Sequence, residues 1–258
     1  MNTSAIDSEL ATDSAAGSGL DSMRLFSPVS PFYADEWVTI YHGDSREIMP
    51  HLKPFDLLLT DPPYGIFAGV DGKRNQGRVN SKHGFREDGT KKTFGKIQVA
   101  KRDWGAAMWD VEPVDEKTME LARSLGGKQV IFGGNYYDLP PTKCWLLWDK
   151  ENGTTQFADA EMAWTNMEKP VRLLRYMWNG IAKKKQETRY HPTQKPLEVM
   201  AWALKQAGEV QTVLDPWMGS GTTLRACKDA HVHCVGIERE REYCEIAVDR
   251  MAQTTMGF

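Results

Sequence analysis

The chain has 258 residues, 41% of them hydrophobic, which is enough to bury one large core, so we treat it as a single domain with insertions. A formal net charge of -3 excludes a protein held to nucleic acid by its overall charge, so any such binding must rest on local basic segments. The four cysteines lack regular spacing, and neither a run of about eighteen apolar residues nor a basic-then-apolar leader is present. We therefore predict a soluble, cytoplasmic protein that uses its cysteines for packing.

The predicted elements begin after an N-terminal tail. Residues 1–25 are rich in Ser, Ala, Asp and Gly and have too few large apolar groups to offset the entropy of ordering, so we expect a flexible tail there. Strand-like segments follow at 38–41 and 55–60. The second is a short continuous apolar run, which is typical of a strand buried in a parallel sheet.

Residues 66–110 form a long insertion in this pattern. They lose periodicity and contain many Gly, Lys and Arg residues. Short strand-like segments return at 128–132, 144–148 and 161–164, and a second basic stretch occupies 172–195.

From residue 196 onward the chain alternates between helical and strand-like patterns. The predicted helices are 197–206, 222–230 and 240–251, and the predicted strands are 211–214 and 232–237. This alternation is typical of a βαβ crossover in a parallel sheet and indicates the α/β class.

One predicted strand-to-helix turn, Asp215-Pro216-Trp217-Met218-Gly219-Ser220-Gly221-Thr222-Thr223, carries an acid and two glycines. Glycines let a ligand approach the backbone, and the helix N-terminus offers unpaired N–H groups. Glu238 ends the next predicted strand, where a carboxylate can accept hydrogen bonds from ribose hydroxyls. The pairing of turn and acid predicts a nucleotide-type ligand.

Three alternatives to this interpretation are a phosphate-binding loop, a dinucleotide site and a turn that binds nothing. A phosphate-binding loop requires Lys directly after the second glycine, where this chain has Thr222, and a dinucleotide fingerprint has three spaced glycines. Asp215 would also face a pyrophosphate unfavourably. An acid before the glycines suits a ligand with a cationic amine, such as S-adenosylmethionine.

A second motif, Asp61-Pro62-Pro63-Tyr64-Gly65, directly follows the buried strand 55–60. It presents a carboxylate, a rigid backbone and an aromatic face at the carboxyl edge of the sheet, where ligands bind in open α/β folds. The two prolines remove N–H donors and fix the carbonyls as acceptors. An ordinary Pro-rich turn is the alternative, and the neighbouring Asp and Tyr argue against it.

These segments resemble the amino-group DNA methyltransferases, which methylate adenine N6 or cytosine N4. Asp61 to Tyr64 resembles their catalytic tetrapeptide, Asp215 to Gly221 their cofactor loop, and His191-Pro192-Thr193-Gln194-Lys195-Pro196 a third segment. The catalytic motif comes first, as in the beta class, and the resemblance spans about residues 38–250. It implies a Rossmann-like S-adenosylmethionine-dependent methyltransferase fold with a mostly parallel sheet flanked by helices and an antiparallel hairpin at one edge.

The resemblance also implies roles for the catalytic residues Asp61, Pro62, Pro63 and Tyr64. Asp61 and the Pro62 carbonyl would accept hydrogen bonds from the target amine, while Tyr64 would stack on the flipped base. Transfer would be direct and in line, without a covalent enzyme intermediate. A carbon-5 cytosine methyltransferase would need a nucleophilic Cys after a Pro, and none of the four cysteines follows a proline.

For the cofactor, the resemblance places Asp215 and Gly219 at the methionine moiety, Glu238 at the ribose and Asp44 near the adenine. The implied cofactor-binding residues are Asp44, Asp61, His191, Thr193, Lys195, Pro196, Asp215, Pro216, Gly219, Ser220, Gly221, Thr222, Glu238 and Arg239. By itself, Asp44 is as well explained as a turn acid, and Lys195 as a surface lysine.

DNA is the expected partner, with its target base flipped out of the duplex. Between residues 66 and 102 ten Lys and Arg face three acids, and cations on phosphates strengthen binding without reading sequence. The alternative is a solvated loop that contacts nothing. The predicted DNA-binding residues are Lys73, Arg74, Arg78, Lys82, Arg86, Lys91, Lys92, Lys183, Lys184 and Lys185.

Within a catalytic domain spanning 26–258, target recognition is expected to divide between the insertion and a short region at about 165–190, which includes Arg172 and Arg175. Trp104, Trp109 and Trp178 could stack on bases, but large aromatic residues more often belong to the core. Asn135-Tyr136 and Trp148-Asp149-Lys150 are candidates to line the target pocket. A zinc site at Cys227, His231, His233 and Cys234 is rejected because paired Cys-x2-Cys ligands are missing.

The choice of target amine rests on Asp61. Cytosine-N4 enzymes more often have Ser at this position and RNA or protein amide methyltransferases Asn, so adenine N6 is favoured. A cofactor-binding regulator or inactive DNA-binding partner is a further alternative, which the intact Asp61, Pro62, Tyr64 and Gly221 argue against. The sequence leaves open whether the protein forms a homodimer and whether it serves restriction-modification, a phage or regulation.

Overall fold

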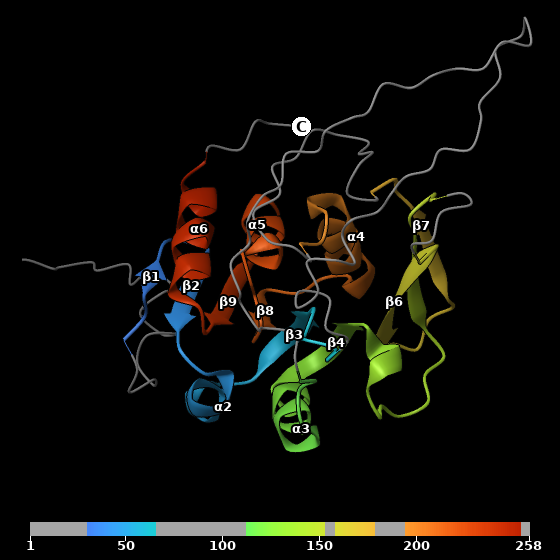
Figure 1. Ribbon diagram of the computed structural model, residues 1–258, viewed down its shortest axis with the longest axis horizontal. Coiled ribbons are helices and arrows are strands. Elements are labelled where there is room, and N and C mark those ends of the chain that lie inside the picture. The colour runs from blue at the N-terminus through green and yellow to red at the C-terminus, as the bar shows by residue number, and fades with distance from the viewer. Residues whose placement is uncertain (1–29, 66–111, 153–157, 179–193, 254–258) are drawn as a thin grey trace, which may run out of the picture.

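The computed structural model describes residues 30–65, 112–152, 158–178 and 194–253, and it shows one mixed β-sheet with helices on both faces (Figure 1). The strands are β1 (Tyr33–Ala34), β2 (Val38–His42), β3 (Phe55–Thr60), β4 (Gly126–Phe132), β5 (Trp145–Asp149), β6 (Ala160–Thr165), β7 (Arg172–Arg175), β8 (Thr212–Asp215) and β9 (His233–Glu238). Their order across the sheet is β1-β2-β9-β8-β3-β4-β6-β5-β7.

The middle of the sheet is parallel, and its two edges are mixed. Strands β2, β9, β8, β3 and β4 run parallel to one another, whereas β6 is antiparallel to both β4 and β5. Strand β7 pairs in parallel with β5 and forms the outer edge. The predicted α/β fold with a mostly parallel sheet is confirmed. The antiparallel pair β1–β2 lies at one edge of the sheet, and the antiparallel pair β5–β6 lies one strand inside the other edge.

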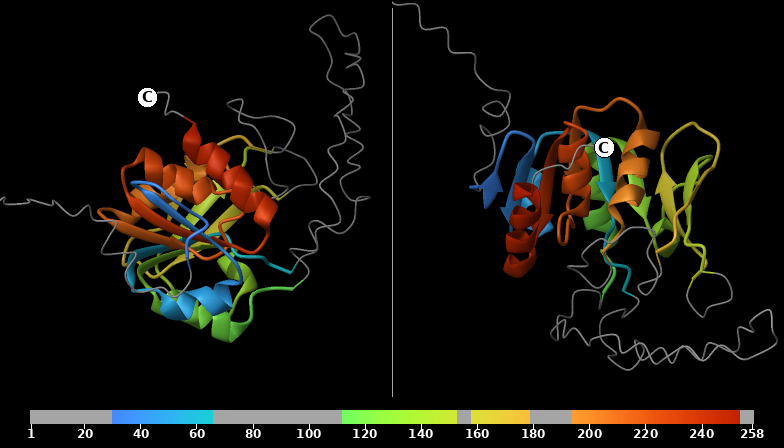
Figure 2. Two further views of the ribbon diagram at one scale, coloured as in Figure 1. Left: turned by 90° about the vertical axis from the view of Figure 1, so that its left-hand side faces the viewer. Right: turned by 90° about the horizontal axis from the view of Figure 1, so that it is seen from above.

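The helices form two layers (Figures 1 and 2). One face of the sheet carries α4 (Leu197–Ala207), α5 (Thr222–Asp229) and α6 (Arg241–Ala252), and the other carries α2 (Ser45–Ile48), the 3-10 turn η1 (Met49–His51) and α3 (Glu116–Ser124). A further 3-10 turn, η2 (Gly134–Tyr136), follows β4.

Strand β3 shows why the central strands are apolar throughout. Leu57 and Leu59 belong to the core cluster under α4, α5 and α6, while Leu58 belongs to the cluster under α2 and α3. All three side chains are fully buried. A strand covered on both faces needs apolar residues at successive positions rather than at alternate ones.

The register of the parallel strands brings their carboxyl ends to one edge. Leu58 pairs with Leu214, Asp215 with Gly236, and His42 with Glu238. The residues that follow β2, β3, β8 and β9 therefore lie beside one another, as the sequence predicted for the two motifs. No helix of the described residues has the length and apolar character needed to cross a membrane.

Candidate active site

The motif after β3 is held in place by two tyrosines of the segment after β4. The hydroxyl of Tyr137 donates a hydrogen bond to the Pro63 carbonyl, and the Tyr64 ring stacks on Tyr136 with 4.9 Å between ring centroids. Gly133 has a φ of +63°, and a Cβ there would lie 2.1 Å from the Tyr64 ring. A glycine at this position therefore lets Tyr64 lie against the backbone.

Both carboxylate oxygens of Asp61 have partners. The Tyr64 hydroxyl donates to Oδ1, and the Lys195 ammonium lies 2.5 Å from Oδ2. Burial raises the pKa of Asp61 despite the nearby Lys195. Burial and Asp61 also raise the pKa of Tyr64 well above 10, so Tyr64 stays a neutral donor.

Lys195 is shared between two carboxylates. Its Nζ lies 3.0 Å from Oε2 of Glu161 on β6, and only 7% of its side chain is exposed. Burial opposes the charge, but Asp61 and Glu161 raise the pKa of Lys195 above its usual range. Although burial alone would raise the pKa of Glu161, Lys195 and Lys150 lower it to about 2. The cluster therefore holds two partly exposed carboxylates against two lysines.

A hydrogen bond joins this site to the glycine turn after β8. The Thr60 hydroxyl, one residue before Asp61, donates to Oδ1 of Asp215 at 2.7 Å, and the Trp217 N–H donates to the same oxygen at 3.2 Å. Asp215 is 2% exposed, and burial raises its pKa to about 6. The end of β3, which carries the Asp61 motif, is thus directly hydrogen-bonded to the glycine turn.

Glu238 lies across the same turn. Its Oε2 accepts a hydrogen bond from the Gly219 N–H at 3.0 Å, and its Oε1 accepts one from the Glu240 N–H at 2.7 Å. Burial raises the pKa of Glu238 to about 7. Two carboxylates therefore flank the glycine turn, which fits a ligand with a cationic amine and ribose hydroxyls.

The family of the chain follows from comparison with known proteins. The model of the family described as DNA methylase, the N6/N4 class, matches residues 112–249, which is more than half of the chain. The chain belongs to this DNA methylase family. The match covers β4 to α6, including Lys195, Asp215 and Glu238.

Curated relatives and solved structures agree with this assignment. The chain is 24% identical to the type II methyltransferase M.ScaI of Streptomyces caespitosus, over 97% of this chain and 94% of the relative. It is also 24% identical to M2.LlaDCHI of Lactococcus lactis subsp. cremoris, over 86% and 91%. The PvuII DNA methyltransferase, described as cytosine-N4-specific, superposes with a TM-score of 0.55 at 15% identity, over 90% of this chain and 92% of that one. The M1.HpyAVI-SAM complex superposes with a TM-score of 0.50 at 23% identity, over 84% of this chain and 100% of that one. These two likenesses show the fold.

Other predicted cofactor residues of this DNA methylase have partners within the protein. The Arg250 guanidinium donates to the hydroxyls of Ser220 and Thr222, which gives these hydroxyls a role in holding the turn. Asp44 caps α2 and is bonded to the Arg46 side chain, and Arg239 is exposed next to Glu240. Pro196 and Pro216 are buried, Pro196 as the residue before α4.

Several predictions lie outside the described residues. These are the tail 1–25, the insertion 66–110, Trp104, Trp109, His191, Thr193 and the DNA-binding candidates Lys73, Arg74, Arg78, Lys82, Arg86, Lys91, Lys92, Lys183, Lys184 and Lys185. Trp178 is 6% exposed and belongs to the core, as predicted. The four cysteines are buried and unpaired, so their assignment to packing is confirmed.

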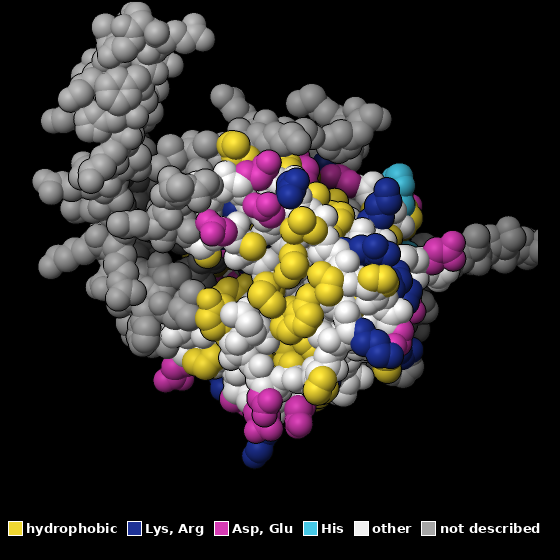
Figure 3. Space-filling view, turned by 90° about the vertical axis from the view of Figure 1, so that its right-hand side faces the viewer, with side chains coloured by type: hydrophobic (Ala, Val, Ile, Leu, Met, Phe, Trp, Pro, Cys, Tyr) yellow, Lys and Arg dark blue, Asp and Glu magenta, His cyan; other side chains and the backbone are white. Residues whose placement is uncertain are grey.

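The edge strand β7 contains Arg172 and Arg175, which the sequence assigned to a basic surface. Arg175 pairs with Asp149, 3.4 Å away. Apolar side chains gather on this side of the molecule (Figure 3), and Val171 and Leu173 are about half exposed. Within the described residues this edge is therefore mixed in character rather than uniformly basic.

Sequence reasoning missed Glu161 and Arg250 as site residues. Glu161 stands opposite Trp148 in the β5–β6 pair, beside Lys150, and interrupts an otherwise apolar strand. That interruption was the available signal. Arg250 is 5% exposed on α6, and an arginine among apolar neighbours near the chain end gave no specific pattern.

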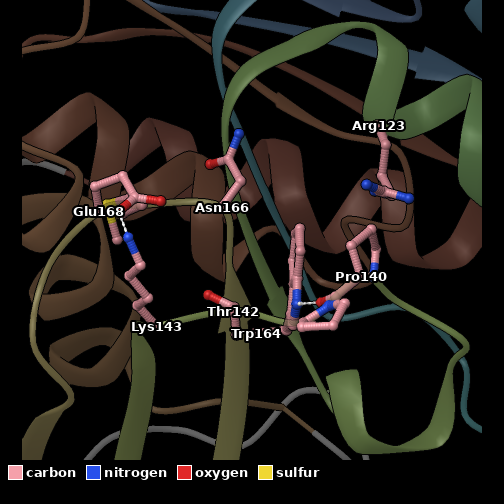
Figure 4. Close-up of a pocket in the computed structure, with 9 residues that line it drawn as sticks. Arg123, Pro140, Thr142, Lys143, Trp164, Asn166 and Glu168 are labelled. Carbon is pink, nitrogen blue, oxygen red and sulfur yellow. Dashed lines mark hydrogen bonds and ion pairs between the residues drawn. The ribbon is translucent and has the colours of Figure 1, made fainter.

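A cavity of about 390 Å³ lies away from this site (Figure 4). It is lined by Arg123, Pro140, Pro141, Thr142, Lys143, Trp164, Asn166, Met167 and Glu168. Trp164 donates a hydrogen bond from Nε1 to the Pro140 carbonyl across it. Because β6 is antiparallel to β4, residues 166–168, which follow β6, lie near the amino-terminal end of β4. The cavity is therefore at the end of the strands opposite the Asp61 motif.

Proposed function

We propose that the protein transfers a methyl group from S-adenosylmethionine to the exocyclic N6 amine of adenine in DNA. The observation that carries this proposal is the hydrogen bond from Thr60 to Asp215. It joins the turn that would hold the target amine to the turn that would hold the methyl donor. Donor and acceptor must meet within a few ångströms for in-line transfer, and adjacent turns at one sheet edge satisfy this requirement.

The described residues fit the cofactor. Glu238 would accept hydrogen bonds from the ribose hydroxyls, Asp215 would face the amino acid end, and Gly219 would allow its close approach. S-adenosylmethionine supplies a methyl group on a positively charged sulfur. Burial destabilises the charged forms of Asp215 and Glu238 and so raises the pKa of each carboxyl. A cation bound nearby would stabilise both carboxylates.

The protein's part in the transfer is to hold the amine. Asp61 and the Pro62 carbonyl would each accept a hydrogen bond from one N–H group of the amine. This arrangement directs the nitrogen lone pair toward the methyl carbon. The nitrogen–carbon bond would form as the sulfur–carbon bond breaks, the electron pair of the broken bond would stay on sulfur, and the nitrogen would pass a proton to the Asp61 carboxylate or to water. Tyr64 would stack on the base, which has to leave the duplex to reach this edge.

Cytosine N4 is the second candidate. The PvuII enzyme, which shares the fold, is described as cytosine-N4-specific, and the family includes both amines. Adenine is favoured because Asp61 stands where the resemblance gives Ser to most cytosine enzymes. The curated relatives are type II methyltransferases, so we place the protein in restriction-modification, with the basic insertion 66–110 contacting DNA phosphates.

The proposal is tested by expressing the protein in a bacterial host that lacks its own DNA methylation. Genomic DNA is digested to nucleosides and analysed by mass spectrometry, with cells that carry the empty vector as the control. We expect N6-methyladenine only in the expressing cells. N4-methylcytosine would overturn the choice of base, and the absence of both modified nucleosides would overturn the proposed function.

A further inference from the structure

Four charged side chains form a row that leads from the hairpin β5–β6 to the catalytic motif. Lys150 pairs with Oε1 of Glu161, Oε2 of Glu161 lies 3.0 Å from the Lys195 ammonium, and that ammonium lies 2.5 Å from Oδ2 of Asp61. Lys195 also lies 3.3 Å from the Tyr64 hydroxyl. Glu161 is thus a second carboxylate within ion-pair distance of Lys195.

This arrangement creates a conflict with the role of Asp61. A carboxylate that already holds an ammonium and a phenol has less negative charge to offer a target amine. During transfer, positive charge also develops on the amine nitrogen, and an ammonium bonded to the same carboxylate would oppose it. In the arrangement described, Asp61 is therefore poorly prepared to accept the amine.

A shift of Lys195 from Asp61 toward Glu161 would remove this conflict. Lys195 is almost fully buried, so moving it away from Asp61 into an apolar environment would leave an unpaired charge at high cost. Glu161 can take the ammonium with a small shift, since they are already 3.0 Å apart. Lys150 holds the other oxygen of Glu161 and fixes it in position.

We propose that Lys195 moves from Asp61 onto Glu161 when the target amine arrives, which makes Glu161 a positioning residue for the reaction. This inference rests on the proposed methyl transfer. In the absence of the target base, Lys195 pairs with Asp61. When the base binds, its amine replaces Lys195 at the Asp61 carboxylate. Glu161 does not touch the base and acts only by holding the lysine.

The test uses Glu161→Gln, which keeps the shape of the side chain and removes its charge. Lys195 then has Asp61 as its remaining anion among the described residues, so we expect kcat to fall about tenfold or more while the affinity for S-adenosylmethionine is unchanged. Glu161→Asp, which keeps the charge, should lose less activity. Glu168→Gln is the matched control, since Glu168 pairs with Lys143 on the exposed surface.

The decisive variant is the double substitution Glu161→Gln with Lys195→Met. Removing the lysine frees Asp61, so the double variant should transfer methyl faster than Glu161→Gln alone when the two are compared at the same pH. An active wild type with a double variant no faster than the single one would overturn this inference alone. A wild type without any transfer to DNA would overturn the proposed function and this inference with it.

Discussion

Glu238 and Asp215 are carboxylic acids that folding makes weaker. Burial raises the pKa of Asp215 to about 6 and that of Glu238 to about 7, although each accepts hydrogen bonds from backbone N–H groups that favour the anion. Near neutral pH Glu238 is therefore partly protonated. A ligand that donates hydrogen bonds to its carboxylate competes with the proton.

This competition predicts a pH-dependent cofactor affinity. In the proposed site the ribose hydroxyls would donate to the anion of Glu238, so the Kd for S-adenosylmethionine should fall as the pH rises from about 6 to about 8, by up to about tenfold. Glu238→Gln should bind more weakly and lose most of this dependence. Calorimetry on both proteins over this range makes the comparison, in which the titration of the ligand itself is common to both. Equal pH dependence in the two proteins would contradict the role of Glu238.

At the scale of elements, the start of α5 depends on a glycine that is both strained and crowded. Gly221 has a φ of +78°, and a Cβ there would lie 2.9 Å from the Cβ of Ala247 on α6. Gly208, after α4, has a φ of +74° and a ψ of −152°, a conformation that is essentially confined to glycine, and no atom lies within 4 Å of its Cβ position. A methyl group at Gly208 would therefore cost backbone strain alone, whereas at Gly221, which lies in the left-handed helical region, it would also meet α6.

We predict that Gly208→Ala lowers the free energy of unfolding by about 1 to 3 kcal/mol through backbone strain alone. Gly221→Ala should cost about 2 to 3 kcal/mol, because its backbone is left-handed and the new methyl group also pushes α5 against α6. Urea unfolding of the two variants and the wild type measures both. A loss of no more than about 1 kcal/mol for Gly221→Ala would mean that the contact between α5 and α6 gives way without cost.

The elements with strong patterns were predicted from the sequence, and the others were not. Strand β3 was predicted at its observed bounds, and the alternation from α4 to α6 was correct within one or two residues. Helix α3 was missed, although Asp115 caps it, because it directly follows the aperiodic insertion. Strand β7 was read as part of a basic stretch, since an edge strand with charged ends lacks the apolar run of a buried one.

At the scale of the whole molecule, tertiary packing determines the part of the site that the sequence could not predict. The motifs at Asp61 and Asp215 were visible because each lies within one local segment. The pair of Lys195 with Asp61 joins residues 134 positions apart, and the contact of Lys195 with Glu161 depends on how β6 packs beside β4. Such contacts follow from tertiary packing, which local patterns do not specify.

The central claim is that Asp61 holds the target amine during methyl transfer. The direct test is single-turnover transfer from radiolabelled S-adenosylmethionine to unmethylated DNA by the purified wild type, Asp61→Ala and Asp249→Asn, whose exposed carboxylate on α6 serves as the control. We predict that Asp61→Ala lowers the rate at least about a hundredfold while the control keeps the wild-type rate. Transfer by Asp61→Ala at the wild-type rate would contradict the claim.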